Sequence, residues 1–256
     1  MSADADIAIT AALAGAAEVR SRYGAPVTRH SKGGIDFATE ADLAAEHAVR
    51  AVVRAARPDD AFVGEEEGLQ GDPDAVRRWL VDPLCGTLNF AAGTPGIGVN
   101  VALLVAGEPG PAAVADPLTG EAFWTDGTGA WVRGVDGTDA PLVPSADSRL
   151  VDVDVDHERA WAAAVLASPG LASYAFRGFS TSLALVWVAA GRRAAYLQAG
   201  DLRGSVHFAA PLAICRAAGV VLSGLAGQPV LADAGGLVAA ADRTTHARML
   251  DVVSEA

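Results

Sequence analysis

The stretch WLVDPLCGTLNFAAGTP, Trp79–Pro95, decides how this 256-residue sequence is interpreted. Its apolar start, Trp79–Val81, ends at Asp82, a pattern typical of a buried strand that delivers an acidic side chain to a site. Cys85 follows in a glycine-containing turn, two residues before Thr87. Burial alone does not explain a thiol between these polar groups, so we interpret Cys85 as a candidate functional residue.

The composition favours a large buried core and an acidic surface. Hydrophobic residues make up 51% of the chain, and no apolar run reaches the roughly 18 residues of a membrane span. The net charge of −12 disfavours nucleic acid as a partner. Residues 1–18 lack a basic segment ahead of an apolar one, so we predict no signal peptide, no membrane partner and a cytoplasmic location. The second cysteine, Cys215, lies in an apolar helical stretch and is predicted to be a core residue.

Hydrophobic periodicity predicts an N-terminal half with both helices and an antiparallel sheet. Helices are predicted at 3–22 and 38–56, the second capped by Thr39 with Asp42 three residues later. Strands and strong turn signals alternate over 99–134, which indicates an antiparallel sheet.

A polar segment with two prolines, 135–148, is the best internal boundary. We therefore predict an N-terminal α+β half, 1–145, and a C-terminal α/β half, 146–256, in which strands and helices alternate. The helices predicted there are 158–167, 180–190 and 208–218.

The opening stretch resembles the metal-binding signature of the inositol monophosphatase superfamily, W-x-x-D-P-[LI]-D-G-T-x-N-F, with Cys85 in place of the second aspartate. Four more fragments resemble family segments in the same order: IDFATEAD (35–42), FVGEEEG (62–68), ADPLTGEAFWTDGTGAWVRG (115–134) and RGFSTSLALVWVAAGRRAAYL (177–197). The resemblance covers nearly the whole chain. It implies an α/β fold, a layered α/β/α/β/α sandwich, in a protein that is often a homodimer and hydrolyses small phosphomonoesters with Mg²⁺.

The resemblance also implies roles for individual residues. The residues matching Glu65 and Asp82 hold the first metal in the family. The pair matching Thr87 and Asp42 orients the attacking water. Phosphate transfer needs such groups because it depends on charge neutralisation and on the placement of water.

The second metal of the family depends on two aspartates that are absent here. One is replaced by Cys85, and the other best matches His207; a slip in that register would suggest Asp201 instead. The resemblance further implies a substrate-binding set, in which two positions depart from the family pattern (Phe179 and Gln198). The set comprises Gly86, Phe179, Ser180, Gln198 and Arg177.

Side chains that share one ion in the family lie within roughly 3–4 Å of one another. We therefore expect Asp82, Cys85 and His207 to meet. The interpretation we favour is a repurposed enzyme with no cofactor, in which Cys85 is the nucleophile and His207 the general base, oriented by Asp82 or Asp201. The reaction would be acyl transfer, hydrolysis or cyclisation of a small metabolite.

Two other interpretations remain open. Glu65, Asp82, Cys85 and His207 form a mixed oxygen, sulfur and nitrogen set, which prefers Zn²⁺ or another transition ion to Mg²⁺. A phosphomonoesterase of sugar or inositol phosphates would then survive with an altered metal preference, or a weak Mg²⁺ site would work alone. Alternatively, the chain is an inactive pseudo-phosphatase that binds a ligand or partner.

Overall fold

The computed structural model describes the backbone of residues 3–33 and 36–256 and the side chains of 3–30 and 37–256. The chain divides into two compact units. The first runs up to Pro141 and also includes Val206–Ile214; the second comprises Leu142–Ser205 and Cys215–Ala256. The sequence placed the boundary at residue 145 and assigned the whole of 206–214 to the C-terminal half.

An eight-stranded sheet forms the framework of the first unit, in the order β10-β9-β8-β7-β6-β5-β3-β4. Its strands are β3 (Ala61–Gly64), β4 (Gly68–Gln70), β5 (Arg77–Cys85), β6 (Gly98–Val105), β7 (Glu108–Ala115), β8 (Ala122–Thr125), β9 (Ala130–Arg133) and β10 (Asp139–Pro141). Neighbouring strands are antiparallel except for β3 and β5, which run parallel. The antiparallel sheet predicted over 99–134 is confirmed.

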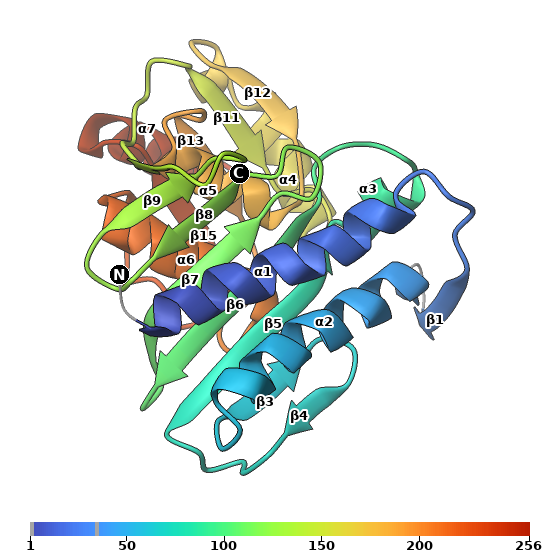
Figure 1. Ribbon diagram of the computed structural model, residues 1–256. Helices are drawn as coiled ribbons and strands as arrows, with labels where there is room; N and C mark the ends of the chain where they lie inside the picture. The colour runs from blue at the N-terminus through green and yellow to red at the C-terminus, as the bar shows by residue number, and fades with distance from the viewer. Residues whose placement is uncertain (1–2, 34–35) are drawn as a thin grey trace. The chain divides into compact units, whose positions relative to one another are not determined.

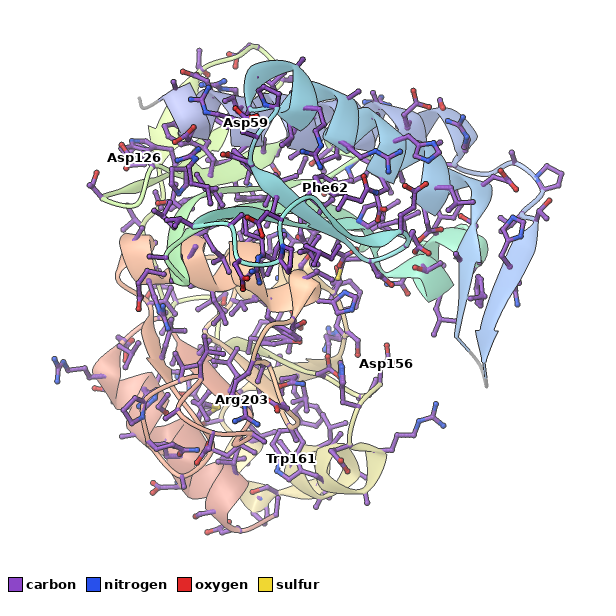
Figure 2. All side chains as sticks on the ribbon, turned by 90° about the horizontal axis from the view of Figure 1, so that it is seen from below. Asp59, Phe62, Asp126, Asp156, Trp161 and Arg203 are labelled. Atoms are coloured by element: carbon purple, nitrogen blue, oxygen red, sulfur yellow. The ribbon has the colours of Figure 1, made fainter. Side chains whose placement is uncertain are left out.

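Two long helices, α1 (Ala3–Arg22) and α2 (Glu40–Ala56), lie side by side over one face of this sheet (Figure 1). Gly15 of α1 makes that close approach possible. A Cβ there would stand 2.8 Å from Val49 Cγ2 on α2 and 3.0 Å from Val99 Cγ1 on β6. Figure 2 shows Phe62 of β3 beneath the helix layer, where it is fully buried.

The start of α2 is fixed by the capping box that the sequence predicted. The Thr39 hydroxyl accepts a hydrogen bond from Ala41 N at 3.1 Å, and Thr39 N donates to Asp42 Oδ2 at 2.7 Å. The cap also places Asp42, which is 1% exposed, on the inner side of the helix. A hairpin that the sequence did not predict, β1 (Arg29–Gly33) and β2 (Asp36–Thr39), leads into the cap.

The central strand β5 is anchored at its beginning. Trp79 Nε1 donates to Asp60 Oδ2 at 2.8 Å, and Arg77 Nε donates to both oxygens of the same carboxylate. Trp79 is fully buried, as predicted for a core residue. A strand held in this way gives a firm support to the functional residues at its other end.

The second unit is an α/β unit built on a five-stranded sheet in the order β12-β11-β13-β15-β14. Its elements are β11 (Leu150–Val153), α4 (Arg159–Ala167), the 3₁₀ turn η1 (Pro169–Leu171), β12 (Ala175–Gly178), α5 (Ser182–Ala189), β13 (Ala195–Gln198), β14 (Val221–Ser223), β15 (Leu237–Ala240) and α7 (Arg243–Ser254). Strand β11 runs parallel to β12 and β13, whereas β15 is antiparallel to β13 and β14. The α/β fold class is confirmed.

Helix α6 (Val206–Ala218) contributes to both units, because the division falls after Ile214. Its C-terminal part carries Cys215, which is fully buried and donates from Sγ to Leu185 O at 3.3 Å. Burial raises the pKa of the Cys215 thiol well above its usual range. The prediction of a core cysteine is confirmed. Among the described helices, none combines the length and the apolarity needed to cross a membrane.

Candidate active site

The first component of the site is the end of β5. Its register with β6 shifts between Asp82 and Cys85, an irregularity that re-aims the side chains at this point. Asp82 is fully buried, whereas Cys85 is partly exposed. Gly86 follows with φ of +97°, and a Cβ there would lie 2.6 Å from Gly96 O, so only glycine fits this turn. Helix α3 (Thr87–Ala91) begins immediately afterwards.

The second component is the first turn of α6, which brings His207 to the same place. His207 Nδ1 lies 2.7 Å from Asp82 Oδ2. One ligand atom from each of Asp82, Cys85 and His207 lies within 4.8 Å of the other two. The interaction with Cys85 lowers the pKa of Asp82 and raises the pKa of His207. The three side chains that we expected from the sequence to meet do lie together.

A buried asparagine links these two components, and a proline leaves free the backbone carbonyl that the asparagine binds. Pro211 lies inside α6 and has no N–H, so the carbonyl four residues earlier, that of His207, receives no helical hydrogen bond from it. Asn100 Nδ2 on β6 donates to this carbonyl at 3.4 Å and to Asp82 Oδ2 at 3.0 Å. Asn100 therefore links the backbone of α6 to the carboxylate at the end of β5.

Electrostatics favour an ion pair within the group. Burial acts against the charge on His207, but the Asp82 charge and the hydrogen bonds that the imidazolium donates to Asp82 and Cys85 outweigh it and raise the His207 pKa to about 12. Burial also acts against the charge on Asp82, yet the His207 charge and hydrogen bonds hold the Asp82 pKa below its usual value. The His207 side chain is 41% exposed, so solvent screens part of this attraction. The direction of both shifts indicates an imidazolium beside a carboxylate.

Glu65 lies at the edge of the same group. Its backbone N–H donates to Val81 O on β5 at 3.1 Å, and its carboxyl Oε2 lies 3.9 Å from His207 Nδ1. Its side chain also interacts with Asp82 and lowers the Asp82 pKa. Glu65 therefore lies beside the group formed by Asp82, Cys85 and His207.

Asp42 and Thr87 form an adjoining pair. Thr87 Oγ1 lies 3.2 Å from Asp42 Oδ1 and 3.1 Å from Leu84 O, so its single proton serves one of these two acceptors at a time. Burial raises the pKa of Asp42 to about 6, although hydrogen bonds from Thr39 oppose the shift.

The donor set does not fit a pair of Mg²⁺ ions. Glu65 and Asp82 offer the hard oxygen atoms that Mg²⁺ prefers, but Cys85 and His207 offer sulfur and nitrogen. A mixed set of this kind suits Zn²⁺ or another transition ion. The residues present therefore do not fit the two-magnesium site that the resemblance implied.

The other predicted substrate-binding residues belong to the second unit. Phe179 stacks on Trp187 with 5.7 Å between ring centroids, and Ser180 Oγ accepts from Val155 N at 3.0 Å. Gln198, at the end of β13, is fully buried, and neither polar atom of its amide has a partner among the described residues. Arg177 on β12 is exposed.

Asp201, the alternative to His207, also lies in the second unit. Its carboxylate pairs with the Arg203 guanidinium at 2.6 Å.

The sequence patterns did not identify three residues that the structure shows to support the site or its loops: Asn100, Pro211 and Glu46. Each had a signal: an asparagine inside the apolar run GVNVALLV, a proline inside a helical pattern, and a glutamate on the apolar side of a helix. What these residues contact depends on elements that are distant in sequence, so the signals did not identify their partners.

Comparison with known proteins relates this geometry to a family. The sequence profile described as the inositol monophosphatase family matches residues 1–256. The Mycolicibacterium smegmatis protein named inositol-1-monophosphatase ImpA is 33% identical over 264 residues, covering 96% of this chain and 92% of its own. The inositol-1-monophosphatase of Caulobacter vibrioides matches at a higher identity over a shorter stretch. The two sequences are 42% identical over 103 residues, which cover 40% of this chain and 40% of that protein.

Two solved structures show the same fold. The extragenic suppressor protein suhB of Bartonella henselae has a TM-score of 0.88 at 24% identity and 99% coverage of both chains. The inositol monophosphatase of Thermotoga maritima has a TM-score of 0.84 at 21% identity, covering 98% of this chain and 96% of its own. The full-length profile match shows that this chain belongs to the inositol monophosphatase family.

Proposed function

We propose that this protein is a thiol-dependent enzyme on the inositol monophosphatase fold, acting on an acyl group of a small metabolite. Cys85 is the nucleophile, His207 transfers protons, and Asp82 orients the imidazole. The observation that carries the proposal is the 2.7 Å separation of His207 Nδ1 and Asp82 Oδ2, with a ligand atom of each within 4.8 Å of the Cys85 sulfur. A nucleophile, a base and an orienting carboxylate in mutual contact are the requirements for this chemistry.

The reaction begins with the thiolate of Cys85 and the imidazolium of His207. The sulfur attacks the acyl carbon, a C–S bond forms, and the bond to the leaving group breaks as that group takes a proton from His207. Acylation removes the thiolate charge, so His207 becomes a stronger acid at the moment when the proton is needed. Neutral His207 then removes a proton from water, whose oxygen attacks the thioester. The C–S bond then breaks, which releases the acid and restores the Cys85 thiolate beside the His207 imidazolium. An amine or hydroxyl of the substrate in place of water would give transfer or cyclisation.

The charge of the site favours an acyl group over a phosphate as the target of the thiol. The Asp82 and Glu65 carboxyl groups lie beside His207, and Asp42 adjoins the site through Thr87, whereas His207 supplies one positive charge. A phosphate would be repelled by such a surround unless a bound cation offset it.

A metal-dependent phosphomonoesterase is the second candidate, supported by the grouping of ligand atoms from Asp82, Cys85 and His207 within 4.8 Å. These residues, with Glu65 beside them, would hold Zn²⁺ or a similar ion. Such an ion would supply positive charge to a phosphate and lower the pKa of bound water. The pseudo-phosphatase interpretation stays open if neither chemistry is found.

An acyl-trapping experiment tests the proposal directly. The purified protein is mixed with 4-nitrophenyl acetate, the nitrophenolate released is followed by absorbance, and the acetylated residue is located by peptide mass spectrometry. We expect a burst of nitrophenolate with acetyl on Cys85, no burst in Cys85→Ala, and slow acetylation and deacylation in His207→Ala. Cys215→Ser is the matched control, because that thiol is fully buried, and it should keep the burst.

The two candidates give opposite results with a phosphate probe. Hydrolysis of 4-nitrophenyl phosphate that needs Zn²⁺ or Co²⁺, stops with EDTA and is lost in Glu65→Gln would favour the metal enzyme. Absence of acetyl on Cys85 in the untreated and EDTA-treated protein alike would contradict the thiol mechanism.

A further inference from the structure

A buried glutamate that lies outside the catalytic group holds the loop that carries Glu65. Glu46 lies on the inner side of α2 and is fully buried. Its carboxylate accepts two backbone hydrogen bonds from the loop after β3: Glu66 N donates to Oε2 at 2.8 Å and Glu67 N to Oε1 at 2.9 Å. Two N–H donors on one carboxylate form a charge-assisted pair, which is stronger than neutral hydrogen bonds.

The glycine before this loop is matched to that carboxylate. A Cβ on Gly64 would lie 2.3 Å from Glu46 Cδ and 2.4 Å from each carboxylate oxygen. The backbone of Gly64 is not in the left-handed region, so conformation alone does not require glycine there. The space that a side chain would occupy is filled by the carboxylate.

The same helix holds the far side of the loop. The Glu67 carboxylate accepts from His47 Nε2 at 2.7 Å and pairs with Arg50, and both partners lie on α2. On the near side, Glu65 N donates to Val81 O of β5. The loop is therefore fixed between α2 and the strand that ends at the active site.

We infer that Glu46 is a positioning residue of the candidate active site, whose carboxylate fixes the backbone of the Glu65–Glu67 loop. Through this loop it holds the Glu65 side chain beside Asp82 and His207. The glutamate touches none of the reacting groups, so it acts through Glu65. Its importance for catalysis rests on the proposed function, but its hold on the loop does not.

The test combines Glu46→Gln with Gly64→Ala. Glutamine keeps the size of the side chain, but its amide has one acceptor oxygen and would turn an N–H₂ group towards a second N–H donor. Gly64→Ala reaches the same end from the other side, because its methyl group displaces the carboxylate. Glu40→Gln is the matched control: the same change on the same helix, at an exposed side chain.

Two readouts are measured in all variants. The first is hydrogen exchange of the Glu66 and Glu67 amides by NMR, which should accelerate roughly ten- to a hundredfold when a charged acceptor is lost. The second is the pH profile of Cys85 alkylation, which should move to higher pH because Glu65 no longer supports the imidazolium. A role confined to stability would lower the melting temperature and leave this profile unchanged.

The inference is upheld if both variants free the two amides and move the alkylation profile while Glu40→Gln does neither. It is overturned if the amides stay as protected as before, or if they are freed and the profile does not move. A double-mutant cycle adds a further check: Gly64→Ala should cost much less stability in Glu46→Ala, where the collision is absent. Failure of the proposed function would be recognised differently, because Cys85 of the unaltered protein would then be alkylated like an ordinary thiol. In that case the exchange of the Glu66 and Glu67 amides still decides whether Glu46 holds the loop.

Discussion

His207 Nδ1 donates a hydrogen bond to Asp82 Oδ2 at 2.7 Å, although the two residues are 125 positions apart in the chain. The contact joins the end of a central strand to the first turn of a helix, and Asp82 is fully buried where it is made. A buried carboxylate with this partner keeps the imidazole protonated and fixes its orientation. In the proposed mechanism, the reactivity of Cys85 depends on that contact.

Replacing Asp82 with asparagine tests the contact itself. The amide keeps the shape of the side chain but removes the charge that stabilises the imidazolium, so the pKa of His207 should fall. Without the imidazolium the Cys85 thiolate is less stable, and we expect alkylation at neutral pH to slow roughly tenfold or more. The measurement is the rate of iodoacetamide labelling at Cys85 with the ring protons of His207 followed by NMR. An unchanged rate would mean that Asp82 does not control the thiol.

Asn100→Leu tests the link between β6 and α6. The change keeps the volume but removes the donor that serves both Asp82 and the His207 carbonyl. We expect a loss of about 1–3 kcal/mol in the free energy of unfolding, the cost of leaving a buried acceptor unpaired. Urea unfolding measures the loss, and Cys85 labelling should slow in parallel. Retention of both properties would show that Asn100 is dispensable.

Gly86→Ala tests the turn between Cys85 and α3, and Gly93→Ala supplies its control. Both glycines have positive φ, +97° and +68°, but a Cβ meets Gly96 O at 2.6 Å at the first and nothing within 4 Å at the second. Gly93→Ala should therefore cost only about 1–2 kcal/mol for the left-handed backbone. Gly86→Ala should cost clearly more and also alter Cys85 labelling. Equal losses in thermal or urea unfolding would refute the close approach.

Asp42 should give stability an unusual dependence on pH. Its pKa is raised from 3.8 to about 6, so the folded state holds the proton where the unfolded state has lost it. The contribution of Asp42 to the free energy of unfolding is therefore complete below about pH 3.8 and is lost as the pH rises to about 6. Relative to the unaltered protein, Asp42→Asn should gain up to about 3 kcal/mol between those pH values, at 1.36 kcal/mol per pKa unit. Urea unfolding of both proteins at pH 4, 5, 6 and 7 measures the difference, and a constant difference would contradict the shift.

Much of the fold could be predicted from the sequence, because many of its helices and strands follow from local sequence patterns. The helices at 3–22 and 38–56 follow from apolar spacing, and the cap at Thr39 follows from the Asp42 three residues later. The sheet over 99–134 follows from its turns. The hairpin β1–β2 and the C-terminal strands β14 and β15 were not predicted, because such short strands carry little periodic signal. Helix α7 was not predicted either.

Only part of the candidate site could be predicted from the sequence. Cys85 and Asp82 share one motif, so their proximity follows from the sequence itself. His207 was placed beside them through a resemblance whose register was open; the structure brings His207 to Asp82, while Asp201 pairs with Arg203. Asn100, Pro211 and Glu46 could not be assigned, because a buried polar side chain acquires its role from partners on other elements.

The Asp82–His207 ion pair has a defined pH window. The pKa of His207 is raised from 6.5 to about 12, so its stabilising effect is complete below about pH 6.5 and is lost as the pH approaches 12. The pKa of Asp82 is lowered from 3.8, so its contribution is present above that pH and is lost as the pH falls below it. The ion pair should therefore persist throughout the neutral range.

The most direct measurement is the rate of iodoacetamide alkylation at Cys85 between pH 5 and 9, with and without EDTA, read by peptide mass spectrometry. Cys215 is the internal control, because its buried thiol should stay unlabelled in the folded protein. We expect rapid labelling of Cys85 well below the ordinary thiol pKa of about 8.5, indifferent to EDTA and slowed by His207→Ala. Labelling that rises only near that pH, or that EDTA switches on by removing a bound metal, would contradict the claim that Cys85 is a nucleophile activated by His207.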